Sequence, residues 1–208
     1  MTLGRRRMDI VLALLLLAVL WPVLVVLVGV ILILDGRPVL YISERMRAPG
    51  KPFMLWKFRT MTNVATDSGV SGGDKAHRIT RTGAVMRRYR LDEIPQLWNI
   101  LRGDIGFVGP RPPLRRYVER FPAVYGEVLK DRPGVTGLAT LVFHRTEERL
   151  LAECTTPEET EAVYERRCIP VKARLDLIYA KNRNLCLDLR MMVATVFRRI
   201  PPVPHKHR

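Results

Sequence analysis

The sequence predicts an α+β, mostly helical protein that has an N-terminal re-entrant membrane helix-break-helix and one small cytosolic domain. Three observations lead to this prediction. Residues 10–34 form a run of 25 residues without a charge, a hydroxyl or an amide. Strand-like segments follow only near the start of the remaining chain, and capped helical segments dominate its end. We therefore expect a basic N-terminus with the membrane hairpin at 1–34, one domain at 35–200, and a basic tail at 201–208.

The uncharged run predicts the first element, a hairpin within the membrane. It is longer than the roughly 7–15 residues of a signal-peptide core, so it must lie in lipid. Pro22 lies near its middle, where it removes a helical hydrogen bond. Each arm then has about 12 residues, or about 18 Å of helix, which suits one leaflet of a ~30 Å hydrocarbon core. We expect the vertex at Trp21 and Pro22.

The charges beside this run predict its orientation. Arginines precede it at 5–7 and follow it at Arg37, Arg45 and Arg47. The positive-inside rule then places both ends on the cytoplasmic side of the membrane. A single membrane span, kinked at the proline, is the alternative, because proline is tolerated in membrane helices.

The elements of the following domain are predicted from turn and capping signals. Val39–Ile42 and Phe53–Arg59 are expected to be short strands around an Ala48-Pro49-Gly50 turn. Helices are expected afterwards, the second of them stopped by Gly103 and the third interrupted at Pro122. They cover Thr82–Arg90, Glu93–Leu101, Leu114–Lys130, Thr156–Cys168, Pro170–Asn182 and Cys186–Arg199.

The composition limits the class of protein. The 208 residues hold 35 Lys and Arg against 20 Asp and Glu, a net charge of +15. Three cysteines give neither a paired disulfide framework nor a C-x-x-C motif, which fits a reduced, cytosol-facing protein. The arginines lack interleaved aromatic residues and a reading helix, so we expect no nucleic-acid partner.

The chemistry of the sequence is concentrated in residues 78–116, which contain nine arginines and only three acidic residues. Two of the acids, Asp92 and Glu93, are adjacent. In one interpretation Asp92 caps a helix and Glu93 complements its dipole. In the other, one carboxylate is a nucleophile and the second handles a metal ion or a proton, while the arginines keep both ionised and bind phosphates. The tetrapeptide alone leaves both open.

Two further features favour phosphate binding. Residues 103–113 contain three glycines followed by Arg111 between prolines, which is suited to bringing backbone and one guanidinium against a phosphate. Lys57 and Arg59 lie two residues apart on a predicted strand, so their side chains are expected on one side.

Five motifs in a fixed order identify a family. They are Lys57-Phe58-Arg59-Thr60-Met61, Leu91-Asp92-Glu93-Ile94-Pro95-Gln96-Leu97, Asn99-Ile100-Leu101-Arg102-Gly103-Asp104, Val108-Gly109-Pro110-Arg111-Pro112 and Arg132-Pro133-Gly134-Val135-Thr136-Gly137. Together they closely resemble the bacterial sugar transferases, the monotopic polyprenyl-phosphate phosphoglycosyl transferases in their small, single-domain form.

The resemblance implies an enzyme of the bacterial cytoplasmic membrane, with its catalytic domain on the cytosolic face. It would transfer a phosphosugar from a UDP-sugar to polyprenyl (undecaprenyl) phosphate and release UMP, the first membrane step of polysaccharide or glycoconjugate synthesis. The family uses Mg²⁺ and an Asp-Glu dyad, with the aspartate as the nucleophile of a ping-pong reaction. These roles fall on Asp92 and Glu93, which we also expect to hold the metal.

The remaining candidate residues would bind phosphate or substrate, and a homodimer is left open. They are Lys57, Arg59, Arg88, Arg111 and Arg145.

The chain departs from the family pattern in two places that bear on function. Trp21-Pro22 replaces the usual Ser-Pro at the helix break, and Leu138-Ala139-Thr140 replaces a Trp-Gln pair. The alternative function is a membrane-anchored adaptor without catalysis, whose basic face binds anionic lipid.

Overall fold

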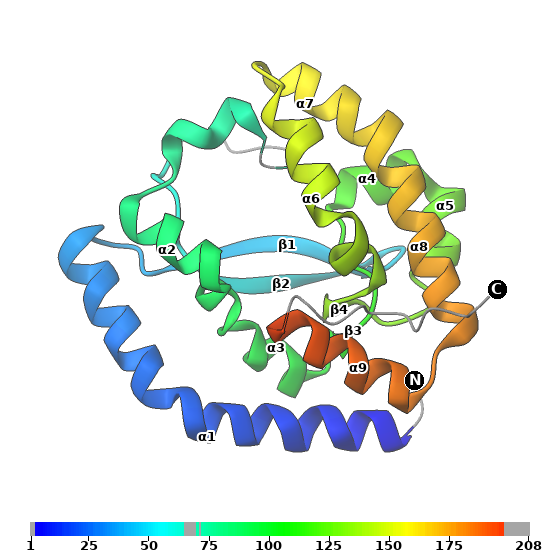
Figure 1. Ribbon diagram of the computed structural model, residues 1–208, viewed down its shortest axis with the longest axis horizontal. Coiled ribbons are helices and arrows are strands. Elements are labelled where there is room, and N and C mark those ends of the chain that lie inside the picture. Colours follow the sequence, from blue (N-terminus) through cyan, green and yellow to red (C-terminus); the bar gives the residue numbers. More distant parts are fainter. Residues whose placement is uncertain (1–2, 65–69, 71, 198–208) are drawn as a thin grey trace.

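A two-stranded hairpin lies at the centre of the molecule, and helices surround it (Figure 1). The computed structural model describes residues 3–64, 70 and 72–197, so the predicted tail at 201–208 lies outside the described residues. The strands are β1 (Leu40–Ala48), β2 (Lys51–Phe58), β3 (Gly106–Val108) and β4 (Gly134–Thr136). The α-helices are α1 (Leu3–Leu34), α2 (Arg81–Tyr89), α3 (Gln96–Arg102), α4 (Arg115–Arg120), α5 (Pro122–Val128), α6 (Leu138–Ala152), α7 (Pro157–Val163), α8 (Ile169–Asn182) and α9 (Leu185–Val196). The predicted α+β, mostly helical class is confirmed.

The central hairpin is fixed to α3 by one buried side chain. β1 and β2 pair antiparallel from Leu40–Phe58 to Ala48–Lys51, so β1 extends six residues beyond the predicted strand end at Ile42. Asn99 of α3 is fully buried; its Nδ2 donates to the carbonyl of Met54 (2.7 Å), and its Oδ1 accepts from the backbone N–H of Trp56 (3.0 Å). These bonds hold the middle of β2 against α3 and so position Lys57, the next residue.

A second, parallel pair of short strands occupies the segment that we expected to be a phosphate-binding loop. β3 pairs with β4, and the glycines of both allow a very close approach of the two backbones. A Cβ on Gly109 would lie 2.3 Å from the carbonyl oxygen of Arg132, and one on Gly134 would lie 2.3 Å from the Gly109 nitrogen. Gly109 and Gly134 therefore serve strand packing, and Arg111 and the two prolines after it reach the cavity described below.

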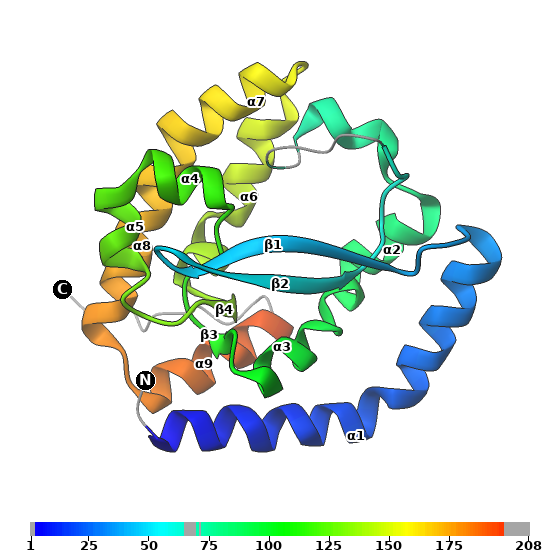
Figure 2. The same ribbon diagram turned by 180° about the vertical axis from the view of Figure 1, so that it is seen from behind.

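Helix α1 corrects the predicted break at Trp21-Pro22. It runs as one α-helix with Pro22 inside it, and it is long and apolar enough to cross a membrane, by length and composition. Figures 1 and 2 show that its axis changes direction part-way along, so the helix is bent rather than broken. A proline inside a helix removes one hydrogen bond and commonly kinks the axis without ending the helix.

The N-terminal end of α1 packs on the domain near α3 and α9. The guanidinium of Arg6 donates to the carbonyls of Ile100 and Leu101, two of the last carbonyls of α3, and so caps that helix. Arg5 forms an ion pair with the fully buried Asp188 of α9. The first turns of α1 are thus attached to the domain by charge-assisted bonds.

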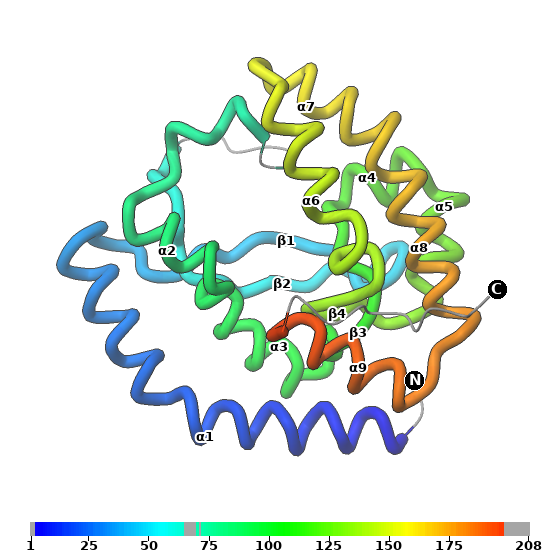
Figure 3. Tube along the Cα trace, in the orientation of Figure 1, coloured from blue at the N-terminus to red at the C-terminus, as the bar shows by residue number. Residues whose placement is uncertain are grey.

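The C-terminal end of α1 is held by Arg59, which follows β2. Its buried guanidinium donates to the carbonyl oxygens of Asp35 (2.6 Å), Gly36 (2.8 Å) and Pro38 (2.6 Å). The tube in Figure 3 shows the consequence: both ends of α1 approach the same domain while its middle runs along the outside.

Candidate active site

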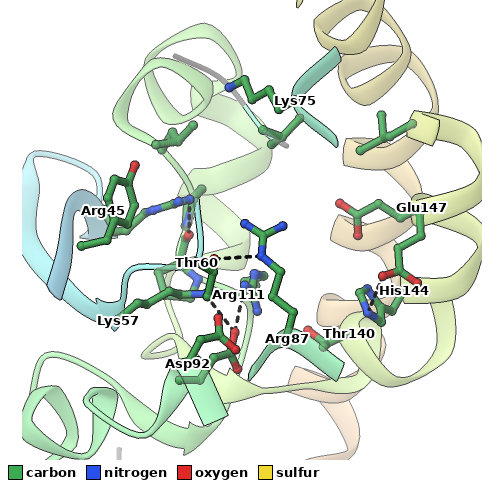
Figure 4. Close-up of a pocket in the computed structure, with 18 of the residues that line it drawn as sticks. Arg45, Lys57, Thr60, Lys75, Arg87, Asp92, Arg111, Thr140, His144 and Glu147 are labelled. Carbon is green, nitrogen blue, oxygen red and sulfur yellow. Dashed lines mark hydrogen bonds and ion pairs between the residues drawn. The ribbon is translucent and has the colours of Figure 1, made fainter. Parts of the chain in front are cut away.

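A cavity of about 600 Å³ lies between the hairpin side of the domain and helices α6 and α8. It contains six of the seven predicted catalytic and binding residues: Lys57, Arg59, Arg88, Asp92, Glu93 and Arg111. The seventh, Arg145, is an exposed residue of α6 and is not among those that line the cavity. Figure 4 shows side chains entering the cavity from opposite sides.

Asp92 does not cap a helix. It lies in a 3₁₀ turn, Leu91–Glu93, whereas α3 begins at Gln96 with Pro95 in the N-cap position and without a side-chain cap bond. The capping interpretation of Asp92 is therefore wrong. Arg90, just before the turn, has a left-handed backbone (φ 56°), which costs a non-glycine residue about 1–2 kcal/mol. This sharp change of direction turns Asp92 inward.

The carboxylate of Asp92 is buried but uncommitted. The residue is only 8% exposed, and within the described part of the chain no hydrogen bond or ion pair to its carboxylate is found. Burial, together with the charge of Glu93, raises the pKa of Asp92 above its usual value, although Lys57, Arg87 and Arg111 act in the opposite direction. A buried carboxylate beside three cations, with free lone pairs, has the properties of a nucleophile.

Glu93 has the opposite environment. Its Oε1 accepts from Lys57 Nζ (2.9 Å) and Arg111 Nη2 (3.1 Å), and its Oε2 accepts from Arg90 Nη1 (3.3 Å). Burial alone would raise the pKa of Glu93, but the charges of Lys57, Arg111 and Arg90 outweigh it and hold that pKa far below its usual value. Glu93 therefore stays ionised and orients the cations that border Asp92. We call the set Lys57, Arg87, Arg90 and Arg111 the cationic wall.

Arg87 belongs to this site although we did not predict it individually. Its Nε donates to the hydroxyl of Thr60 (2.9 Å), and in Figure 4 its guanidinium extends between the two sides of the cavity. Arg88, which we did predict, also lines the cavity and lies over the ring of Tyr89. The run of arginines predicted a basic site. Which of the neighbours Arg87 and Arg88 points toward the centre of the cavity could be decided only from the direction of each side chain in the structure.

Arg59 lines the cavity, yet the hydrogen bonds of its guanidinium hold the residues that follow α1. Its guanidinium is directed to main-chain carbonyls rather than kept open for a ligand. Its phosphate-binding role remains a prediction, as does that of Arg145.

The site offers a limited ligand set for the expected Mg²⁺. Among the described residues, no group of three or more His, Cys, Asp or Glu side chains could hold a metal ion. Mg²⁺ is, however, often bound by one or two carboxylates together with substrate phosphates and water. Asp92 fits that arrangement because its oxygens are uncommitted. Glu93 would have to release Lys57 or Arg111 before it could join.

The opposite side of the cavity comes from a region where we predicted no catalytic residue. Figure 4 shows Thr140, His144 and Glu147 of α6 across the cavity from Asp92, and Lys172 and Asp176 of α8 line it as well. We call these five residues the α6–α8 wall. The spacing of the α6 residues, i, i+4 and i+7, places them on one helix face and is the signal that could have found them.

Comparison with known proteins decides the family. A model of the family described as bacterial sugar transferase matches residues 1–201. The chain belongs to the bacterial sugar transferase family. Among its relatives, the UDP-glucose:undecaprenyl-phosphate glucose-1-phosphate transferase of Klebsiella pneumoniae is 33% identical over 93% of this chain and 39% of its own length.

Two more relatives show the range of lengths in this family. The uncharacterized sugar transferase EpsL of Bacillus subtilis is 31% identical over 92% of this chain and 85% of its own length. The UDP-N-acetylgalactosamine-undecaprenyl-phosphate N-acetylgalactosaminephosphotransferase of Aeromonas hydrophila is 28% identical over 92% of this chain and 42% of its own length. This sugar transferase thus spans about two fifths of the Klebsiella and Aeromonas relatives.

Proposed function

We propose that this sugar transferase moves a phosphosugar from a UDP-sugar to polyprenyl phosphate, releases UMP, and forms a covalent intermediate on Asp92. The observation that carries the proposal is the buried, uncommitted carboxylate of Asp92 beside the cationic wall. The Klebsiella and Aeromonas relatives, whose names combine a UDP-sugar with undecaprenyl phosphate, support this class of substrates. The adaptor alternative gives no reason for burying this carboxylate in a cavity.

In the first step, an oxygen of Asp92 attacks the phosphorus that carries the sugar. The bond from that phosphorus to the bridging oxygen breaks, and UMP leaves with the electron pair. Charge develops on the phosphoryl oxygens, and Arg111, Arg87 and Lys57 are placed to neutralise it. Such positioned cations account for much of the rate enhancement in phosphoryl transfer.

In the second step, a phosphate oxygen of polyprenyl phosphate attacks the same phosphorus and displaces the Asp92 carboxylate. The products are polyprenyl-diphosphate-sugar and the free enzyme. Covalent catalysis lets one compact site serve two chemically different partners in turn. Mg²⁺, held by Asp92 and substrate oxygens, would supply further charge neutralisation when bound.

The first test replaces each carboxylate by its amide. Asp92→Asn removes the nucleophile without changing the shape of the side chain, so UMP release should fall by at least about 10³-fold. Glu93→Gln weakens the orientation of the cations and should cost less, about 10–100-fold. UMP release from a panel of UDP-sugars with undecaprenyl phosphate is the measurement, and thermal unfolding confirms folding.

Glu119→Gln is the matched control, because Glu119 is an exposed carboxylate of α4 that lies outside the cavity lining. It should retain close to full activity. A folded Asp92→Asn protein with near wild-type UMP release would contradict the role of Asp92 as the nucleophile. Absence of UMP release by the wild-type protein with every UDP-sugar of the panel would favour the non-catalytic adaptor.

We further propose that α1 is a re-entrant helix, bent rather than broken, at the cytoplasmic face of the bacterial inner membrane. The contacts of Arg6 with α3 and of Arg59 with the residues after α1 support this, because a span would place the two ends of α1 on opposite sides of the bilayer. The symmetric flanking charge agrees.

A topology test follows in a Cys186→Ser background, which removes the exposed native cysteine. Cysteines introduced by Gly4→Cys and, separately, Lys51→Cys should both resist a membrane-impermeant thiol reagent in intact cells. Both should react in inverted vesicles. Labelling of the Gly4→Cys protein alone in intact cells would establish a true span.

A further inference from the structure

The cavity divides its charges between two sides. The cationic wall surrounds Glu93 with three cations and leaves positive charge beside Asp92. On the α6–α8 wall, the Lys172 Nζ is instead neutralised by the Glu147 carboxylate at 2.8 Å, and Asp176 adds a further carboxyl group. Carboxylates repel phosphate, so the α6–α8 wall is unsuited to the diphosphate and suited to a neutral group that donates hydrogen bonds.

The Glu147–Lys172 pair is largely shielded from water. Their side chains are 18% and 13% exposed, and Lys172 also donates to the hydroxyl of Tyr164 (3.3 Å) and lies over its ring. Lys172 thus has partners within the wall and holds Glu147 in place. The hydrogen bond from Lys172 is accepted by Oε1 of Glu147, so Oε2 can accept a hydrogen bond from a ligand that enters the cavity.

Asp176 provides a second acceptor of hydrogen bonds in this wall. The backbone N–H of Ala139, in the first turn of α6, acts on this carboxyl and lowers its pKa, yet within the described part of the chain its buried Oδ1 has no hydrogen-bond partner. An unsatisfied buried polar atom costs about 1–3 kcal/mol, so a donor that reaches this oxygen is favoured. Desolvation raises the pKa of this carboxyl to about 7. Asp176 therefore lies beside the 138–140 segment, where Leu138-Ala139-Thr140 replaces the Trp-Gln pair of the family pattern.

We propose that the α6–α8 wall is the subsite for the transferred sugar, in which Glu147 and Asp176 accept hydrogen bonds from sugar hydroxyls. The proposal rests on the proposed function, because the sugar is bound to the phosphorus that Asp92 attacks and must lie within the same cavity. Sugar hydroxyls donate hydrogen bonds, whereas an ionised diphosphate offers only acceptors. The ribose hydroxyls of the nucleotide are the other source of the same chemistry, and the experiment separates the two.

The experiment measures equilibrium binding of UDP-glucose, UDP-N-acetylgalactosamine and UMP to the full-length protein in membrane mimetics, alongside UMP release. Glu147→Gln should weaken binding of the better UDP-sugar by about 10-fold or more, since a charged acceptor for hydroxyls is lost. Asp176→Asn should do the same at pH 8, above the pKa of about 7 of that carboxyl. Binding of UMP, which has no sugar, should change less than about twofold. Glu153→Gln, an exposed residue just after α6 and outside the cavity, should leave all three affinities unchanged.

Two results would overturn the subsite. Equal weakening of UMP and UDP-sugar binding would assign the wall to the nucleoside, and unchanged binding of all three would assign it no ligand. Asp176→Asn keeps an acceptor for the Ala139 N–H, and if it fails to fold, Glu147→Gln decides alone. A wild-type protein that binds UDP-sugars but releases no UMP would contradict the proposed function while leaving the subsite testable by affinity.

Discussion

The two sides of the cavity differ in how each treats its carboxylates. On the cationic wall, Glu93 is bonded by three cations, and its neighbour Asp92 has no bonded partner among the residues that the structure describes. On the α6–α8 wall, Glu147 is matched by one lysine, and Asp176 is buried with a raised pKa. One cavity can therefore suit a strongly anionic group on one side and a neutral group on the other. The requirement is that the cation of the second side, Lys172, is neutralised by a carboxylate of the same side.

The largest difference between the walls should appear when a cation is removed from the cationic wall. Arg111→Ala deletes a guanidinium that is positioned by Glu93, and kcat/KM should fall by about 10²–10³-fold, or about 3–4 kcal/mol. Glu93 keeps Lys57 and Arg90, so the fold should survive. Steady-state UMP release measures the effect.

Arg149→Ala is the matched control for that loss. Arg149 is an exposed arginine on α6 outside the cavity lining, so its removal should change kcat/KM by less than about twofold. Comparable losses at both positions would mean a diffuse electrostatic role and would erase the distinction between the walls.

A separate effect, on the stability of the fold rather than on catalysis, should distinguish the α6–α8 wall by pH. The pKa of Asp176 is about 7 in the folded protein against a usual 3.8, so the folded state retains a proton that the unfolded state releases. Stability should therefore decline as the pH rises from about 4 to about 7, by up to roughly 4 kcal/mol. Asp176→Asn cannot ionise and should lack this decline.

Thermal unfolding at pH 5 and pH 8 measures that difference. The melting temperature of the Asp176→Asn protein relative to wild type should rise between the two pH values. A difference that does not depend on pH would show that Asp176 has an ordinary pKa. The carboxylate of Glu153 is the exposed control, and Glu153→Gln should give no such trend.

The sequence pointed to part of the site around Asp92, including Lys57 and Arg111 of the cationic wall but not Arg87 or Arg90, because much of its chemistry is local. Asp92 and Glu93 are adjacent, and Arg111 follows within a short motif. The interpretation of Asp92 as a helix cap failed because Pro95 delays α3 until Gln96. A turn of three residues therefore replaced the expected first turn of the helix.

The α6–α8 wall could not be predicted in the same way. Glu147 and Lys172 lie 25 residues apart and meet only because α6 packs on α8. The pairing of β3 with β4 is likewise long-range. The glycines that allow it are also typical of loops, so the sequence alone predicted a loop there. Turn and capping signals predicted most helices, whereas the contacts between distant segments needed the three-dimensional structure.

The most direct measurement of the central proposal mixes the protein with Mg²⁺ and a UDP-sugar in the absence of any lipid acceptor. If Asp92 is the nucleophile, mass spectrometry should find a phosphosugar adduct on the peptide that contains Asp92, with an equal amount of UMP released. The Asp92→Asn protein should give neither. Absence of an adduct, with UMP appearing only after polyprenyl phosphate is added, would contradict the account and indicate direct transfer between the two bound substrates.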